Sequence, residues 1–226
     1  MAQKVHPIAL RLNQTNAWGS KWFSSKNFIA YLREDVSIRE FLKKELKEAS
    51  VNEVIMERTA NGVTIVIRSA KPGVIIGRSG AGVEDLKKKV MNEFFRGRRV
   101  QLSINIEEVS NPSLFATLVG QQVIADIEKR MPYRRAMKSV IERSMKAGAL
   151  GIKVRVSGRL NGAEIARRET LVQGKIPLHG LRANIDYASD FAHTIFGAVG
   201  VKVWIYKGDV FRDKKDNEKE QQGTKV

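Results

Sequence analysis

Cysteine is absent from the 226 residues, which excludes disulfide bonds, thiolate nucleophiles and thiolate metal sites. The three histidines are scattered, without neighbours at ligand spacing, so we expect no metal site and no cofactor. Apolar runs are also short, and none approaches the roughly 18 residues of a membrane-spanning helix. The first residues, MAQKVHPIALRLNQ, lack the continuous apolar stretch of a signal peptide. We therefore expect a cytoplasmic protein without a membrane partner.

Acidic residues are few relative to basic ones. The chain has 40 Lys and Arg against 24 Asp and Glu, a formal net charge of +16 and a pI near 10.2. Such a balance favours a polyanionic partner, with nucleic acid and an anionic membrane surface as the two candidates. The excess is concentrated in residues 111–207, which hold sixteen basic and seven acidic side chains, whereas residues 35–110 are nearly neutral.

Periodicity predicts the elements of the first half. The motif SIRE at Ser37 matches a capping box, with Glu40 reaching back to the Ser37 amide, and predicts that a helix begins there. Residues 51–69 alternate as two strands joined at an Asn-Gly dipeptide, which suits a tight hairpin. A glycine-rich loop, an amphipathic helix and a further alternating strand complete residues 37–107. The GVII segment before the loop is compatible with strand or helix.

The glycine-rich loop is KPGVIIGRSGAG. It lacks the Gly-Lys-Ser/Thr ending of a P-loop and does not fit the G-x-G-x-x-G dinucleotide fingerprint. Gly77, Arg78, Ser79 and Gly80 form a GxxG tetrapeptide, in which the glycines let a sugar-phosphate backbone approach and the central pair supplies a cation and a donor. Most such tetrapeptides are plain turns. The order of elements around this one resembles the type-two KH fold, so we interpret it as a nucleic-acid clamp.

The second half predicts a helix pair followed by a mixed or antiparallel sheet. Two consecutive helices are expected over 111–148, and then strands near 151–158, 164–175, 182–190 and 200–207. The predicted fold class is α+β with two domains. Its segments are a basic, extended N-terminal arm (1–20), a type-two KH domain (21–110), a helix-pair and sheet domain (111–208) and a disordered charged tail (209–226).

Five stretches resemble the bacterial small-subunit ribosomal protein S-three family, in the family's order. They are QKVHP followed by RL, YRRAMK, VSGRLNGAEIAR, IPLHGLRANIDYA and GVKVWIYKG. The resemblance covers residues 1 to about 210. Ala9 and Asn13 stand where the family has glycines, and the charged tail has no counterpart in the resemblance.

This resemblance implies a non-enzymatic, ribosome-associated component of the small-subunit head. Its expected RNA partners are small-subunit ribosomal RNA and messenger RNA, and its expected protein neighbours are small-subunit proteins ten and fourteen, with protein two as a further candidate. Residues matching Arg134, Arg135 and Lys138 line the family's messenger RNA entrance and take part in unwinding structured messages.

The helix that carries these three residues has one basic face. Seven basic residues and one acid lie between Lys129 and Lys146, a density that suits a track for phosphates. Further candidates for ribosomal RNA contact lie in the arm and in the basic domain: Lys4, His6, Arg11, Arg159, Arg167 and Arg168. We expect Glu164 and Glu169 to form ion pairs with the last three arginines rather than to act as an acid–base pair.

Aromatic residues are expected to pack rather than to stack on bases. Trp204 and Tyr206 alternate with apolar residues in a strand and should be buried in a core or an interface. Trp18, Trp22 and Phe23 are expected to anchor the arm to the KH domain.

Two alternative functions remain open at this point. The first is a free-standing KH-domain regulator or RNA chaperone, which would need a second RNA-reading module. The second is an enzyme that acts on nucleic acid through an activated lysine, but no lysine is marked by the sequence as buried and activated.

Overall fold

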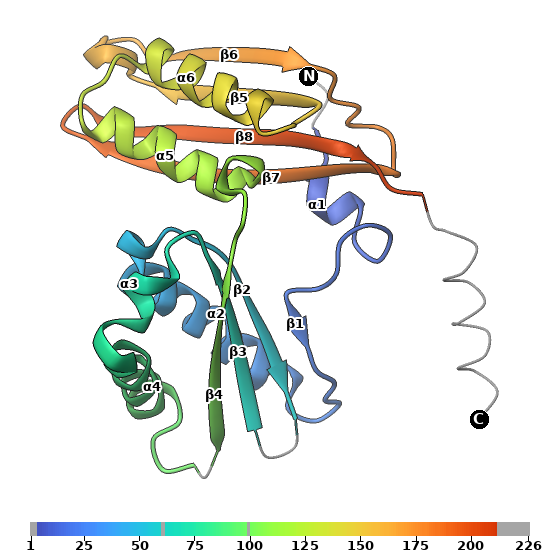
Figure 1. The fold of residues 1–226 in the computed structure, drawn as a ribbon, viewed down its shortest axis with the longest axis vertical. Helices are drawn as coiled ribbons and strands as arrows, with labels where there is room; N and C mark the ends of the chain where they lie inside the picture. Colours follow the sequence, from blue (N-terminus) through green and yellow to red (C-terminus); the bar gives the residue numbers. More distant parts are fainter. Residues whose placement is uncertain (1–3, 60–61, 99, 212–226) are drawn as a thin grey trace.

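The computed structural model describes residues 4–59, 62–98 and 100–211. Two α+β domains lie one above the other, joined by the connection after residue 108 and by the N-terminal arm, which runs beside both (Figure 1). The predicted fold class is confirmed. No helix within the described ranges is long and apolar enough to cross a membrane.

The first domain has a four-stranded sheet covered by helices. Its elements are β1 (Ser20–Lys21), α2 (Phe28–Glu45), η1 (Lys47–Ala49), β2 (Val51–Arg58), β3 (Gly62–Ser69), α3 (Pro72–Ile76), η2 (Arg78–Gly80), α4 (Ala81–Phe94) and β4 (Gln101–Glu108). The sheet order is β1-β2-β3-β4, with β2 and β3 antiparallel and the outer pairs parallel. The predicted hairpin is therefore confirmed, although Asn61 of its turn lies outside the described residues. GVII belongs to the short helix α3, which begins at Pro72.

The first long helix begins nine residues earlier than the capping box predicted. Ser37 lies inside α2, which starts at Phe28, so the SIRE motif is not a helix start. The helix start was predicted too late because an aspartate normally indicates an exposed position, whereas Asp35 is fully buried. Its carboxylate accepts hydrogen bonds from Ser20 Oγ (2.7 Å), Trp22 Nε1 (2.9 Å) and Arg58 Nε (2.7 Å). This buried carboxylate fastens α2 to β1 and β2.

The second domain is an antiparallel sheet with two helices on one face. Its elements are η3 (Pro112–Leu114), α5 (Ala116–Glu128), α6 (Tyr133–Lys146), β5 (Gly151–Gly158), η4 (Leu160–Gly162), β6 (Arg167–Gly174), β7 (Ala183–Thr194) and β8 (Gly197–Asp209). The order is β6-β5-β8-β7, and every pair is antiparallel. β8 extends to Asp209, inside the segment predicted as a tail, and residues 212–226 lie outside the described part of the chain.

The two faces of the second sheet differ because side chains alternate along each strand. Ile152, Val154 and Val156 are fully buried in the main core, which α5 and α6 complete from one side. On the opposite face Trp204 and Tyr206 are buried in a smaller cluster with Ala183, as their strand pattern predicted. The helices thus cover one face only.

The sequence predicted an extended arm, but part of the arm is helical. Residues Pro7–Leu10 form the short helix α1, which contacts β7. Arg11, one residue further, is fully buried, and its guanidinium donates to the carbonyl oxygens of Pro7 (2.9 Å), Leu178 (3.0 Å) and Gly180 (2.8 Å). Burial lowers the pKa of Arg11. The arginine therefore holds the arm against the loop between β6 and β7.

Candidate nucleic-acid interface

The GxxG loop joins α3 to α4 and has the backbone geometry of a sharp reversal. Gly77 and Gly80 have φ of 69° and 83°, and Ser79 between them has φ of 54°, all in the left-handed range that glycine adopts without strain. Arg78 and Ser79 are exposed. A Cβ added at Gly80 would meet no atom within 4 Å, so this point of the backbone is open to a ligand.

Gly82 is a third essential glycine that the GxxG pattern did not single out. A Cβ at this position would lie 2.5 Å from the carbonyl oxygen of Ile75, so the first turn of α4 packs directly on the end of α3. Gly82 therefore fixes the angle between the two helices, while Gly77 and Gly80 shape the exposed backbone. The sequence signal was the third glycine of GRSGAG.

Replacing Gly80 by Asp should weaken RNA contact at the loop far more than it disturbs folding. The new carboxylate would project into open space, where a phosphate would have to approach, and would repel it. Gly80→Asn is the matched control, because asparagine has the same shape, tolerates positive φ and carries no charge. Crosslinking of the loop to RNA in assembled subunits measures the effect. Equal crosslinking in the Asp and Asn variants would show that the loop is only a turn.

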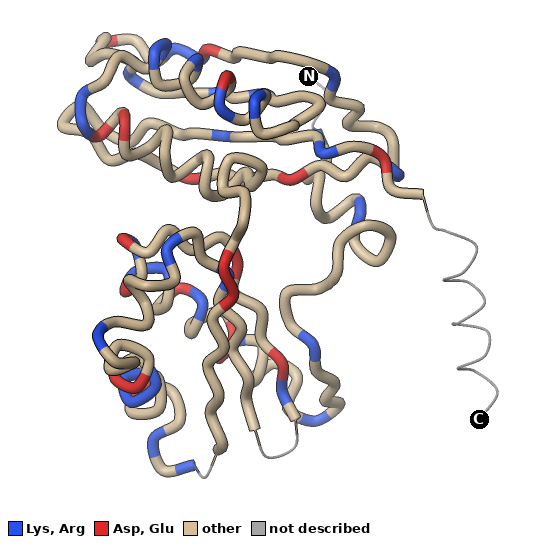
Figure 2. The backbone as a smooth tube through the Cα atoms, in the orientation of Figure 1, with Lys and Arg blue, Asp and Glu red and all other residues tan. Residues whose placement is uncertain are grey.

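The predicted basic residues of the second domain meet at one end of its sheet. β5 ends at Gly158 beside Arg167, where β6 begins, and Ser157 pairs with Arg168. The first turns of α6, which carry Arg134, Arg135 and Lys138, lie at the same end, because Glu169 of β6 bonds to them. Figure 2 shows blue segments on the α5–α6 connection and along α6 at this end of the domain. We call this region, residues 129–138 with 157–168, the basic end.

Exposure at the basic end fits contact with a large anion. Arg135, Lys138, Arg159, Arg167 and Arg168 are exposed, and none of them forms an ion pair with another described residue. Arg159 is held by a hydrogen bond from its Nε to the carbonyl oxygen of Ala163 (2.9 Å) and lies over the ring of Phe196. The guanidinium of Arg159 is thus held in place by the fold and is still open to solvent.

Glu169 does form an ion pair, but with a different arginine from those predicted. Its carboxylate accepts from Arg134 Nε (2.8 Å) and from the Tyr133 hydroxyl (2.7 Å). These hydrogen bonds, that of Tyr133 first, lower the pKa of Glu169, and the same contact raises the pKa of Arg134. Because the carboxylate pKa is depressed, the tie between α6 and β6 is present at neutral pH and is lost as the pH falls through the lowered pKa. Glu164 is exposed and makes no ion pair within the described ranges.

Replacing Glu169 by Gln should tighten binding of single-stranded RNA at low salt by a few fold. Glutamine keeps an acceptor for Tyr133 or Arg134 but removes the negative charge that partly neutralises the arginine. Anisotropy of a labelled unstructured RNA measures the change, which should fade at high salt because the gain is electrostatic. In an Arg134→Ala background the same substitution should have little effect. Weaker binding by Glu169→Gln alone would mean that the carboxylate's charge is needed to orient the arginine.

The arm residues predicted to touch RNA have three different environments. Lys4 is exposed and lies near Lys153, whose pKa is lowered by burial and by the charge of Lys4. His6 is exposed and packs edge-on against Tyr187, with ring centroids 4.8 Å apart. Arg11 is committed to backbone carbonyls inside the protein, as described above, so it fixes the arm and is not open to RNA.

Three aromatic residues were predicted to anchor the arm to the first domain, and of these Trp22 does so. It packs against Phe28 and Tyr31 and donates to Asp35. Trp18 is 58% exposed and bonds only to Asn13 within the arm, and Phe23 is 93% exposed, so the prediction was wrong for both.

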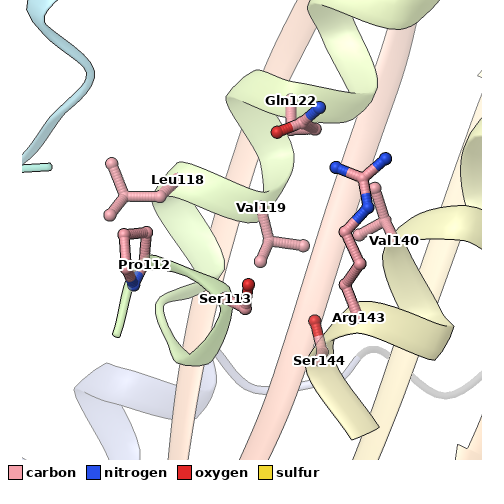
Figure 3. Close-up of a pocket in the computed structure, with 8 residues that line it drawn as sticks. All are labelled: Pro112, Ser113, Leu118, Val119, Gln122, Val140, Arg143 and Ser144. Carbon is pink, nitrogen blue, oxygen red and sulfur yellow. The ribbon is translucent and has the colours of Figure 1, made fainter. Parts of the chain in front are cut away.

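A small cavity of about 60 Å³ lies between α5 and α6 (Figure 3). Val119 and Val140 line it from the two helices, and Arg143 stands at its side with a hydrogen bond to Ser139 Oγ (2.8 Å). A cavity of this volume has room for a solvent molecule or two but not for a nucleobase. Nucleic acid would therefore contact this helix pair across its surface.

Comparison with known proteins bears on the whole chain. The KH domain family matches residues 37–114, and the family described as ribosomal protein S3, C-terminal domain, matches residues 123–205. The small ribosomal subunit protein uS3 of Levilactobacillus brevis is 48% identical over 217 residues, 96% of this chain and 97% of that protein. Those of Enterococcus faecalis and Pediococcus pentosaceus are also 48% identical and cover 97% and 99% of this chain. The chain belongs to the uS3 family.

The two family matches divide this uS3 chain as its structure does. The GxxG loop falls inside the KH match, and the basic end falls inside the C-terminal match. The basic end also includes Lys129 and Arg130, which the sequence did not single out as candidates for RNA contact. Arg130 has a φ of 63° at the end of α5, a position that usually takes glycine. An arginine just after a predicted helix, where glycine is usual, was the feature of the sequence that could have drawn attention to Arg130.

Proposed function

We propose that this chain is a non-enzymatic, structural protein of the small ribosomal subunit that binds ribosomal RNA and helps to form the entrance for messenger RNA. There Arg134, Arg135 and Lys138 grip the phosphates of a single-stranded message. They hold the strand without reading its sequence and so favour the opening of hairpins ahead of it.

The observation that carries the proposal is the basic end. The residues that the resemblance assigned to messenger RNA lie on α6, and three of those proposed for ribosomal RNA lie after β5 and at the start of β6: Arg159, Arg167 and Arg168. The two groups are separated in the sequence, but the start of β6 lies beside the first turn of α6. A cluster of exposed cations suits the backbone of RNA, which supplies most of the affinity in sequence-independent binding. Residues Gly77–Gly80 provide a second, independent backbone clamp in the first domain.

Neighbouring proteins are part of the proposal. We propose contacts with small-subunit proteins ten and fourteen in the subunit head of the cytoplasmic ribosome. An apolar stripe on α2 supports a protein contact: Ile29 is 74% exposed, Phe28 53%, and Leu32 and Val36 follow at helical spacing and are also exposed. Exposed apolar residues that share one helix face are typical of a protein interface.

Co-sedimentation tests the proposal against its main alternative, a free-standing KH-domain regulator. A tagged copy of the full chain should remain with small subunits through a high-salt gradient, because a structural protein is held by many contacts. Release into the soluble fraction at high salt would favour the regulator and contradict the proposal.

A further inference from the structure

The face of the second sheet opposite α5 and α6 carries three cations that no step above uses, Lys153, Arg155 and Lys202, beside Arg168 of the basic end. In the pairing register, Lys153 lies between Val172 and Trp204, Arg155 between Thr170 and Lys202, and Ser157 between Arg168 and Gly200. β7 completes these rows with Tyr187, Ser189 and Phe191. No acidic residue stands in any of the three rows of described strand residues. We call this set of three rows the open face.

Positively charged side chains of the open face lie next to one another and repel. Arg155 and Lys202 are direct cross-strand partners, an arrangement of like charges that destabilises a sheet. Burial and the neighbouring charges of Lys4 and Arg155 lower the pKa of Lys153. Within residues 4–59, 62–98 and 100–211, none of these four cations has a carboxylate partner. A solvated face would usually mix the two signs, so an anionic ligand fits this arrangement.

An exposed aromatic side chain indicates which anion. Phe191 is 58% exposed on the same face, and one edge of its ring lies against its β8 neighbour Gly200. A Cβ at Gly200 would come within 3.7 Å of the ring. Cations beside a partly exposed aromatic ring are the combination that binds single-stranded nucleic acid, through phosphates and base stacking. An acidic protein segment would use the cations but would have no need of the ring.

The spacing of the rows agrees with a nucleic-acid backbone. Successive rows are two residues apart, about 6.7 Å along the strands, which is close to the separation of consecutive phosphates in an extended strand. The arm covers only the other end of this face, where His6 packs on Tyr187 and Lys4 approaches Lys153. The described part of the arm, from Lys4 on, therefore adds a cation to the open face at the end away from Phe191.

We propose that the open face is a second RNA site, which meets the basic end at Arg168, where Lys153, Arg155 and Lys202 each contact a phosphate of an unpaired strand and Phe191 stacks on one of its bases. This proposal depends on the proposed function, because both require the chain to bind RNA. It adds a place and a mode of binding: backbone contact across strands, with one stacked base.

The test uses the full purified chain and two labelled probes of equal length, an unstructured RNA and the same ribose-phosphate chain without bases. Phe191→Ala should weaken binding of the RNA at least about fivefold and leave binding of the abasic chain unchanged. Arg155→Gln with Lys202→Gln should weaken both probes and reduce the salt slope by about 1.4, two contacts at about 0.7 each. The same double variant should not lower the Tm, because it removes a like-charge pair.

Two control variants make the outcomes separable. Phe23→Ala removes a 93% exposed phenylalanine of the first domain and should change neither affinity. Arg134→Ala with Arg135→Ala weakens binding at the basic end and reports on the proposed function alone. If the basic-end variant loses affinity while the open-face variants bind like the unaltered chain, the open-face site is wrong and the proposed function stands. Absence of RNA binding by the unaltered chain would overturn both the proposed function and the open-face site. If the double variant loses binding to polyglutamate but keeps binding to RNA, the open face is a site for an acidic protein and the RNA site is wrong.

Discussion

Subunits that carry alanine at Arg134, Arg135 and Lys138 should assemble normally and translate unstructured messages at nearly the ordinary rate, but should slow strongly on messages with stable hairpins. The three side chains are exposed on the first turns of α6, and the buried face of that helix, which includes Ala136 and Met137, is untouched, so folding should be preserved. The change removes three cations from the point at which we propose the single strand is held.

The loss can be measured in two ways. In subunits, the ratio of translation rates on hairpin and unstructured messages should fall. In the purified chain, the salt dependence of binding to single-stranded RNA should lose about 2 units of slope, since each phosphate contact contributes about 0.7. Alanine at Lys26, Lys44 and Lys47, three exposed lysines of the first domain, is the charge-matched control. Equal slowing on both kinds of message would contradict a role in unwinding.

Replacing Asp35 by Ala should lower the free energy of unfolding of the first domain by about 3 kcal/mol. The carboxylate is fully buried and accepts three side-chain hydrogen bonds, and its removal leaves the nearly buried guanidinium of Arg58 with Glu34 as its remaining partner. Breaking a buried ion pair from one side costs about 3–5 kcal/mol. The loss should also detach β1 and Trp22, because both are tied to this carboxylate.

Urea unfolding of the full chain, followed by hydrogen exchange of the β2 and β3 amides, measures this change separately from the second domain. Asp85→Ala is the matched control, since Asp85 forms an exposed ion pair with Lys88 at 3.7 Å, and such pairs contribute at most about 1 kcal/mol. A change at Asp35 no larger than that at Asp85 would show that the buried network does not hold α2 in place.

Local patterns were sufficient to predict most elements of the fold. Strict alternation in β3 and β5 and helical spacing in α4 and α6 correspond to buried and exposed faces in the structure. The start of α2 could not be predicted, because its first half exposes Ile29 and Leu32 and buries Asp35. Periodicity assumes the reverse, and only the position of Arg58 on β2 explains the exception.

The candidate site was predictable in its residues but not in its arrangement. The glycine loop and the basic face of α6 could be found from the sequence, since each lies within one local segment. The pairing of Arg134 with Glu169 depends on how α6 packs on β6, 35 residues away, which no local pattern contains. The burial of Arg11 depends on carbonyl oxygens more than 160 residues away and was missed for the same reason.

The most direct test of the central claim is crosslinking of a photoreactive message to purified small subunits, with the crosslinked peptides identified by mass spectrometry. The account predicts that a message nucleotide placed at the entrance crosslinks to the peptide containing Arg134, Arg135 and Lys138. It also predicts that ribosomal RNA crosslinks elsewhere on the chain. Message crosslinks that fall on other proteins or on the GxxG loop, with none on the first turns of α6, would contradict it.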